Sequence, residues 1–445
     1  MKTLLLGLFL CLAVLLSSVS AQNYIMIGWN DLGMHCANKD FTNVVVLPPF
    51  NNVHAQVIRV GDSGNLPAVV TAGLRVTYEI PGNTYSVGKT NFWDFEDQIF
   101  GVNLAPNIGL TGSGMTGEMT STENYFAVTG IPITPFTDAN LVTEDPFQLG
   151  QLVAYDASEQ LLAIAQPVVP VSNEINCVSS GCHPSEQNIL NEHTQDGGFD
   201  PANTPILCAS CHSSNALGTP GHPGLPSLSE AIHKEHGERT NDCYKCHPGP
   251  NTHCLRDIMS TQHGMVCQDC HGSVTQVGES IASGREPWLE EPSCGEAQCH
   301  GANFAEEPGK LFRMSRGHGG LFCSACHGEP HAIVTSRVDR DNVQQIALQG
   351  FPGTLKKCEV CHGVAPTGAG PHGIFASTCM CGDADGNGIF TISDAVYLIN
   401  FIFAGGPTPI PICHADADGN AIATISDAVF LINYIFAGGP APHCP

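Results

Sequence analysis

Cysteine and histidine recur together in this 445-residue chain, which contains 21 Cys and 20 His. Five segments have the pattern Cys-x-x-Cys-His, and two more have four residues between the cysteines. The short motifs contain Cys208, Cys211 and His212; Cys243, Cys246 and His247; Cys267, Cys270 and His271; Cys323, Cys326 and His327; and Cys358, Cys361 and His362. The long motifs contain Cys177, Cys182 and His183, and Cys294, Cys299 and His300. Two thiols at this spacing can add to the two vinyl groups of one haem, and the adjacent imidazole then reaches the iron. The motifs therefore predict seven haems c.

Zinc binding is the alternative to haem attachment at the short motifs. A disulfide between the two cysteines is the alternative at the two long motifs. A structural zinc ion needs four ligands, so the cysteine pairs would have to combine with one another. Here every pair is followed by its own histidine. This arrangement favours independent haem attachment at each motif.

Histidines outside the motifs are numerous enough to supply a second axial ligand to every iron. We predict this role for His193, His233, His236, His263, His318, His331 and His372, and keep His222 and His253 in reserve. His233 and His236 lie three residues apart in a segment with a helical pattern, so they can serve two neighbouring haems. Full bis-histidine ligation would leave no iron open to a substrate.

The spacing of the motifs predicts the architecture of residues 173–375. Successive motifs are separated by about thirty residues, too few to build a hydrophobic core around each porphyrin. The porphyrins must then form the core of a loop-rich domain with few short helices. Macrocycles packed in this way would offer a continuous path for electrons.

With these motifs, residues 173–375 resemble the multihaem c-type cytochromes of respiratory bacteria, in particular the extracellular electron-transfer group. The resemblance implies an electron carrier that exchanges electrons with redox partner proteins or an extracellular acceptor, as a single chain, a homo-oligomer or a filament. Some members of the wider group reduce nitrogen or sulfur oxyanions. Those enzymes usually have an open iron or a replaced proximal histidine, and no motif here has lost its histidine.

Cys254 is the only cysteine of this segment outside the motifs, and Arg256 follows it closely. A thiol and a guanidinium beside haems could form a site for sulfur or an oxyanion. The alternative is a thiol that is buried or bridged to Cys36.

The C-terminal segment, residues 376–445, contains a duplicated acidic loop. Oxygen-bearing side chains stand at positions 1, 3, 5 and 12 of each copy, as in the twelve-residue calcium loop, and apolar helices are expected at 395–403 and 428–436. The predicted ligands are Asp383, Asp385, Asn387, Ile389 and Asp394, then Asp416, Asp418, Asn420, Ile422 and Asp427, with each isoleucine contributing its carbonyl. Ala421 replaces the loop glycine and predicts a weaker second site. The pair resembles dockerin-type repeats, which implies a small EF-hand-like α domain, two calcium ions and a cohesin-like partner.

Four cysteines flank these repeats: Cys379, Cys381, Cys413 and Cys444. They are expected to form two disulfides, and the sequence leaves three pairings open.

The N-terminal residues indicate export followed by a β-rich domain. Residues 1–21 have the charge, short apolar core and small-residue ending of a secretory signal peptide cleaved before Gln22. Residues 22–172 contain β-branched runs at 68–71, 74–80 and 152–155, and a turn at 156–159, which predict an antiparallel β-sandwich-like domain. Met34, His35, Cys36 and His54 are residue types that bind copper, although a structural cluster is the favoured interpretation.

Composition excludes some classes of function. The chain has 17 Lys and Arg against 42 Asp and Glu, a net charge of -25, which disfavours nucleic acid as a partner. No later stretch is long and apolar enough to predict a transmembrane helix. The remaining hypotheses are a secreted, cell-surface or periplasmic electron carrier, a multihaem reductase, and a surface adhesion or scaffold protein.

Overall fold

The computed structural model describes residues 24–195, 199–364, 366, 370–373, 379–409, 411–420 and 422–444. The predicted signal peptide and Ala421 lie outside these residues. The chain divides into two compact units, residues 1–364 and 365–445. The first unit contains both the strand-rich N-terminal segment and all seven Cys-His motifs, so these segments pack together.

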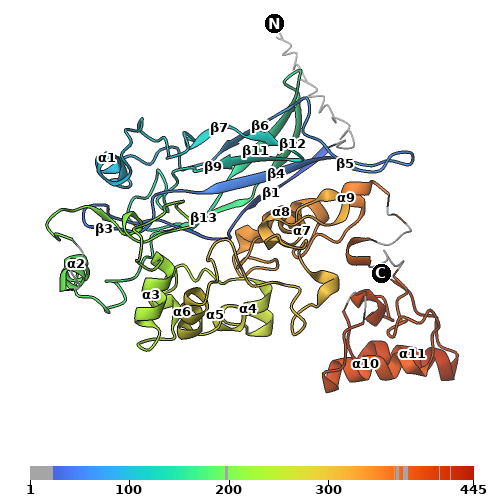
Figure 1. The fold of residues 1–445 in the computed structure, drawn as a ribbon. Coiled ribbons are helices and arrows are strands. Elements are labelled where there is room, and N and C mark those ends of the chain that lie inside the picture. Colours follow the sequence, from blue (N-terminus) through green and yellow to red (C-terminus); the bar gives the residue numbers. More distant parts are fainter. Residues whose placement is uncertain are drawn as a thin grey trace, which may run out of the picture. The chain divides into compact units, whose positions relative to one another are not determined.

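Two antiparallel sheets form the N-terminal part of the first unit (Figure 1). One has the strand order β1-β4-β9-β8 with β5 beside β4, and the other has the order β12-β11-β6-β7. Their strands are β1 Tyr24–Asn30, β4 Asn52–Arg59, β5 Ala68–Val69, β6 Leu74–Glu79, β7 Thr116–Glu118, β8 Thr120–Thr122, β9 Tyr125–Thr129, β11 Gln151–Asp156 and β12 Leu161–Ala165. The antiparallel strands that the β-branched runs predict are confirmed. The predicted turn at 156–159 also connects two antiparallel strands, β11 and β12.

One apolar core lies between the two sheets. Alternate residues of the strands point into it, such as Val76 and Tyr78 of β6 and Phe126 and Val128 of β9, all buried. Arg75, which immediately precedes Val76, is instead paired with Glu118 and Glu159 at the surface. This alternation follows from the two-residue period of a strand, which sends neighbouring side chains to opposite faces.

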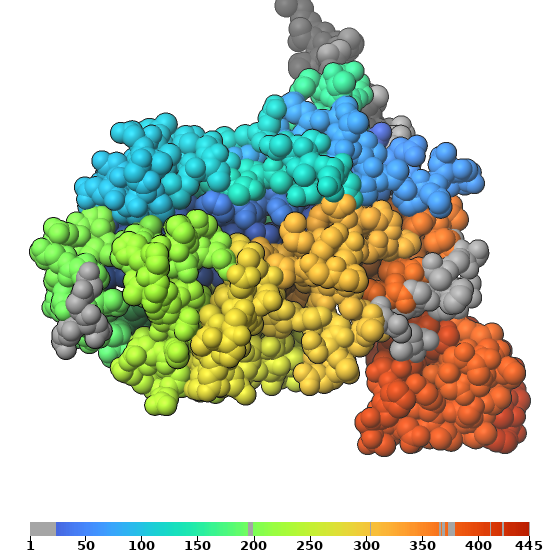
Figure 2. Space-filling model, viewed as in Figure 1, coloured from blue at the N-terminus to red at the C-terminus, as the bar shows by residue number. Residues whose placement is uncertain are grey.

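Short strands complete the N-terminal segment, and one pair of them joins it to the motif segment. β10 (Phe147–Leu149), β13 (Val168–Ser172) and β2 (His35–Cys36) form one small sheet, in which β13 and β2 are parallel. β3 (Val44–Val45) pairs in parallel with β14 (Ile206–Leu207), which immediately precedes a Cys-His motif. These parallel pairs were not predicted. Figure 2 shows the N-terminal segment in blue and cyan covering one side of the motif segment, coloured green to orange.

The motif segment is rich in loops and has mostly short helices. The helices of the first unit are α1 Glu96–Phe100, α2 Glu186–Gln195, α3 Leu228–His236, α4 Ile258–His263, α5 Cys267–His271, α6 Val274–Ala282, α7 Cys323–His327, α8 Asp339–Gln349 and α9 Glu359–His362. Single 3-10 turns occur at Phe92–Asp94, Cys208–Ser210, Cys243–Lys245, Ala302–Phe304, Phe312–Met314 and His318–Gly320. Within the described parts of the chain, no helix combines the length and apolarity required to cross a membrane.

The second unit is built on two equivalent helices, α10 (Ile392–Ala404) and α11 (Ile425–Ala437). Each begins with a threonine capping box and ends at a glycine in the left-handed conformation. Small and apolar residues of both repeats, including Ala395, Leu398, Ala428 and Leu431, form a common core. Two further 3-10 turns lie at Pro371–Gly373 and Ile412–Ala415. The disulfides are Cys379–Cys413 and Cys381–Cys444.

A buried ion pair beside β1 predicts acid sensitivity of the sheet. Asp31 accepts hydrogen bonds from His35 and Asn52, each at 2.8 Å. Burial opposes ionisation of Asp31, but the charge of His35 and these hydrogen bonds lower its pKa to about 2. A carboxyl whose pKa is lowered by folding stabilises the folded state above its unfolded pKa, and that stability is lost as the pH falls.

We therefore expect roughly 2 kcal/mol of unfolding free energy to disappear between about pH 4 and pH 2. The substitution Asp31→Asn should remove this dependence, whereas Asp97→Asn at an exposed aspartate should preserve it. Chemical unfolding followed by circular dichroism measures both variants. If the unfolding free energy of Asp31→Asn still fell with pH as it does in the wild type, this role of the ion pair would be contradicted.

Candidate metal centres

The seven Cys-His motifs close the backbone in the same way. In α5 and α7 the motif is one helical turn that begins at the first cysteine and ends at the histidine. In the other short motifs the histidine N–H donates to the carbonyl of the first cysteine, as from His247 to Cys243 at 2.9 Å. The long motifs also return to the first cysteine, from His183 to Cys177 at 3.1 Å and from His300 to Cys294 at 3.2 Å. The two extra residues are thus absorbed in the loop, and the histidine keeps its place beside the first cysteine.

All fourteen motif cysteines lie within the described residues, and all are free of disulfides. This includes the two long motifs, for which a disulfide was the alternative. Their thiols therefore remain available for other bonds.

Five motif histidines lie opposite a second histidine. Among the described residues, the ring centroids are 6.0 Å apart for His183 and His236, 6.4 Å for His212 and His193, 6.1 Å for His247 and His233, 6.1 Å for His271 and His331, and 5.9 Å for His362 and His318. Every second member belongs to the predicted set of distal ligands. Three of the pairs, His183–His236, His271–His331 and His318–His362, join residues more than forty positions apart.

These separations suit a metal ion held between two imidazoles. Two metal–nitrogen bonds of about 2.0 Å, with about 1.1 Å from each nitrogen to its ring centre, place the centroids about 6.2 Å apart. Two rings joined by a direct hydrogen bond would lie closer, at about 5 Å. The separations therefore leave room for one metal ion between the paired rings.

Backbone carbonyls fix the orientation of several paired rings. The Nδ1 atoms lie within hydrogen-bonding distance of carbonyl oxygens in His193 (Ile189, 3.1 Å), His233 (Ser229, 2.8 Å), His236 (Ile232, 2.8 Å) and His212 (Pro226, 2.9 Å). Because a carbonyl only accepts, Nδ1 must carry the proton, and Nε2 keeps the lone pair that a metal needs. Three of these carbonyls lie one turn earlier in α2 and α3, so the helices themselves set the tautomer.

Burial keeps other paired histidines neutral. Burial lowers the pKa of His247 to about 4, with a smaller contribution from His233 and His271. The pKa of His331 is likewise lowered to about 4, mainly by burial. A neutral imidazole is the form that binds a metal, so these rings need no deprotonation at neutral pH.

Four of the predicted ligands lie outside these five pairs. They are His300 and His327, and the distal candidates His263 and His372. His263 is the last residue of α4. The two reserve histidines are also outside the pairs: His222 is exposed, and His253 packs against the ring of Tyr244 at 5.7 Å. The structure thus separates the two reserve histidines from the five histidine pairs, a distinction that the sequence alone could not make.

Some motifs are neighbours in space: the first lies beside the third, and the sixth lies beside the seventh. α3 carries both His233 and His236, which lie opposite the histidines of two different motifs, and the N–H of Asn176 donates to Cys246 at 3.2 Å. Near the other end, the N–H of Leu355 donates to Cys326 at 2.9 Å, and Cys326 and Cys361 pack against one apolar cluster. Groups attached at these motifs would therefore lie side by side.

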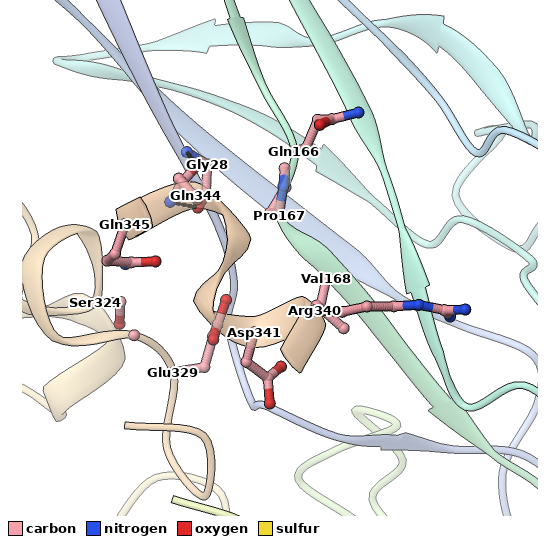
Figure 3. Close-up of a pocket in the computed structure, with 11 residues that line it drawn as sticks. Gly28, Gln166, Pro167, Val168, Ser324, Glu329, Arg340, Asp341, Gln344 and Gln345 are labelled. Atoms are coloured by element: carbon pink, nitrogen blue, oxygen red, sulfur yellow. Dashed lines mark hydrogen bonds between the residues drawn. The ribbon is translucent and has the colours of Figure 1, made fainter. Parts of the chain in front are cut away.

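Sequence reasoning missed a buried polar network that joins the N-terminal sheet to the sixth motif. Gln344 of α8 exchanges two hydrogen bonds with the backbone of Gly28 in β1, at 2.8 and 2.9 Å. Beside them is a cavity of about 10 Å³, space for about one water molecule, which Ser324 and Glu329 help to line (Figure 3). Burial, and secondarily Asp341, raises the pKa of Glu329 to about 7. No local sequence pattern predicts these contacts, because the two partners of each contact come from distant segments.

Arg256 belongs to the same network. Its guanidinium pairs with Asp341 at 2.7 Å, and both side chains are fully buried. It also donates to the carbonyls of Gly33 at 2.7 Å and Cys254 at 3.2 Å. With its donors engaged in this way, Arg256 is not placed to receive a sulfur or nitrogen oxyanion.

The acidic loops of the second unit gather carboxylates at two places. The side chains of Asp383, Asp385 and Asp394 offer oxygens within 4.8 Å of one another, and those of Asp416, Asp418 and Asp427 do the same. Backbone N–H groups and a serine hydroxyl hold several of these oxygens, for example Thr391 to Asp394 at 2.8 Å and Ser393 to Asp385 at 2.7 Å. One oxygen of Asp383 is buried with no hydrogen-bond partner.

Such grouped, partly unsatisfied oxygens fit a hard cation such as calcium. The carbonyls of Ile389 and Ile422 and the amides of Asn387 and Asn420 lie in the same loops. In both loops the side-chain oxygen of the asparagine accepts a hydrogen bond at 2.8 Å from the backbone N–H of the isoleucine two residues later.

The residues considered for copper do not assemble into a ligand set. His35 is bonded to Asp31, and His54 packs against the rings of Trp29 and Tyr125. Among the described residues, the groups of three or more His, Cys, Asp or Glu ligands are the two aspartate groups and Cys379, Cys381 and Cys444. None includes His35, Cys36 or His54, so a structural cluster accounts for them better.

Comparisons of the chain with protein-family models, with curated proteins and with solved structures find no match.

Proposed function

We propose that the chain is an exported seven-haem c-type cytochrome that carries electrons. The observation that carries this proposal is the set of five histidine pairs, each joining a motif histidine to a predicted distal ligand at 5.9 to 6.4 Å. A bound haem supplies an iron atom that gains and loses one electron. The motif cysteines would hold each group covalently, and the two imidazoles would hold its iron from both sides.

At the five motifs with paired histidines, the pairing favours electron transfer over reduction of a small molecule. A reductase needs one coordination position free for its substrate, whereas a paired histidine fills that position. Arg256, whose guanidinium donates to the carbonyl of the unassigned Cys254, is already bound to Asp341. The neighbouring motifs also support conduction, since α3 alone presents histidines to two of them.

The second unit supports attachment at a surface. Its two aspartate groups suit calcium, and the two helices expose apolar side chains at equivalent positions, with Phe403 exposed by 67% and Phe436 by 69%. A duplicated apolar face is suited to docking on another protein, as in the dockerin-type repeats that this segment resembles. A cohesin-like partner would hold the electron carrier at the cell surface or in an assembly. An adhesion or scaffold role for the whole chain is the alternative that this observation favours.

Export accounts for the cysteine chemistry. The leader pattern of residues 1–21 and the two disulfides of the second unit both suit an oxidising compartment. The N-terminal sheets, which enclose one core, would serve as a β-sandwich-like support for the haem segment.

The haem content tests the proposal directly. We expect seven haems per chain, because all seven motifs close on their first cysteine in the same way. Pyridine haemochrome absorbance divided by protein concentration measures the ratio. The double substitution Cys177→Ser and Cys182→Ser should lower it to six, and Val178→Ala in the same loop should leave seven. A ratio of five would remove the two long motifs, and a protein without haem would overturn the proposal.

A further inference from the structure

Cys36 and Cys254 are the two cysteines of the described chain outside the motifs and outside the disulfides of the second unit, and in this structure both are free thiols. They are far apart in sequence. The fold nevertheless brings the two segments that contain them side by side, through two independent sets of contacts.

The first set runs through β13. Cys36 in β2 is paired with Ser172 of β13, and the hydroxyl of Ser172 lies 2.9 Å from the hydroxyl of Thr252. Glu174, just beyond β13, accepts the backbone N–H groups of Thr252 at 2.8 Å and Asn251 at 3.0 Å. The segment that ends in Cys254 is thereby fastened beside Cys36.

The second set runs through Arg256. Its guanidinium donates both to Gly33, three residues before Cys36, and to the carbonyl of Cys254. The two thiols also act on each other: burial first, and then the neighbouring Cys254, raises the pKa of Cys36 to about 12. Thiols in this state are poor nucleophiles and poor metal ligands, so neither is suited to redox catalysis.

We propose that Cys36 and Cys254 form a disulfide that fastens the loop at residues 30–36 to the haem-bearing segment. The inference rests on the proposed export, since only an oxidising compartment maintains such a bond. It forms by exchange with an exported thiol–disulfide oxidoreductase: the two thiols lose their hydrogens and one S–S bond forms, while the partner's S–S bond is broken and becomes two thiols.

The bond would steady the surroundings of His331, the residue opposite His271. The N–H of Asn30 donates to Glu329 at 2.9 Å, and the N–H of Arg256 donates to His331 at 2.9 Å. Gly33 approaches so closely that a Cβ there would stand 1.8 Å from the Pro330 carbonyl. His331 is therefore held between the two segments that the disulfide would join.

Peptide mapping of the full-length protein with its cofactors tests the bond. The protein is unfolded without reductant in excess iodoacetamide, digested and analysed by mass spectrometry. We expect one linked pair of peptides containing Cys36 and Cys254, two hydrogens lighter than their sum, and the pairs Cys379–Cys413 and Cys381–Cys444 serve as internal references. Alkylation of both Cys36 and Cys254 would overturn the proposal, as would a link from either one to a motif cysteine.

Thermal unfolding gives a second, independent readout. Cys36→Ser, Cys254→Ser and the double variant should each lower the midpoint by the same amount, about 5–10 °C, because each removes the same bond. Losses that add in the double variant would show that the two cysteines act separately. Haem content is measured in the same samples, so a failure of the haem proposal is recognised apart from a failure of this one.

Discussion

Replacing His193 by alanine is expected to convert one low-spin iron per chain into a high-spin iron. His193 lies on the exposed surface of α2, and its ring centroid is 6.4 Å from that of His212. Its removal would leave His212 as the only axial histidine at that site. Because the side chain is exposed and its Nδ1 contacts only the helix that carries it, the fold should be retained.

Electron paramagnetic resonance of the oxidised protein measures the outcome. We expect a high-spin signal that integrates to about one spin system per chain and that disappears when an exogenous ligand such as cyanide fills the open position. His222→Ala is the matched control, because His222 is also exposed but lies outside the five pairs. A fully low-spin spectrum for His193→Ala, or a high-spin signal in both variants, would show that the pairing with His212 is not axial ligation.

A conservative variant separates ligation from packing. His193→Met retains a donor atom of adequate reach, so the iron should return to low spin. Its reduction potential should rise by on the order of 0.1 V, since a methionine ligand stabilises the ferrous state relative to histidine. If His193 acted through packing alone, the methionine would not restore the low-spin state, and it would not shift the reduction potential of a single haem.

Sequence could nominate the candidate haem ligands much better than it could predict which histidines lie opposite one another. The motifs are local, so spacing alone nominates their cysteines and histidines. The pairing depends on the tertiary path: His236 lies opposite His183, the histidine of a motif well before it, while its helical neighbour His233 lies opposite His247. Helical periodicity predicted that the two rings share a face, and only the fold shows which motif each one meets.

The N-terminal segment shows the same division between local and distant information. Alternating β-branched residues predicted β6 and β11, because the period of a strand is written in consecutive residues. The two-residue strands β2 and β3 carry no such period, and their partners in β13 and β14 are 136 and 162 residues away. Buried pairs such as Arg256 with Asp341 are invisible for the same reason, since neither residue has an unusual neighbour in sequence.

Calcium is expected to stabilise the second unit strongly while leaving the haem spectrum unchanged. Each loop gathers three aspartates within 4.8 Å, and burial, with neighbouring Asp385 and Asp383, raises the pKa of Asp394. A cation that binds only the folded loops removes this repulsion and adds about 2.7 kcal/mol per site at a free concentration one hundred times the dissociation constant. Differential scanning calorimetry with calcium or with a chelator measures the shift. No shift would contradict the calcium sites.

The variant Asp394→Asn makes the test sharper, because its effect should change sign with calcium. An asparagine still offers an oxygen to the N–H of Thr391, which Asp394 accepts at 2.8 Å, so the helix cap is retained. In chelator the variant should unfold at a higher temperature than the wild type, since one of three repelling charges is gone. In saturating calcium it should unfold at a lower temperature, since a charged ligand of the first loop is lost.

Asp427→Asn should behave alike but with a smaller loss of stability in calcium, because Ala421 replaces the glycine of the second loop, which predicts weaker binding there. If Asp394→Asn were destabilising in both conditions, the carboxylate would be acting as a structural cap alone, and the first loop would not be a cation site.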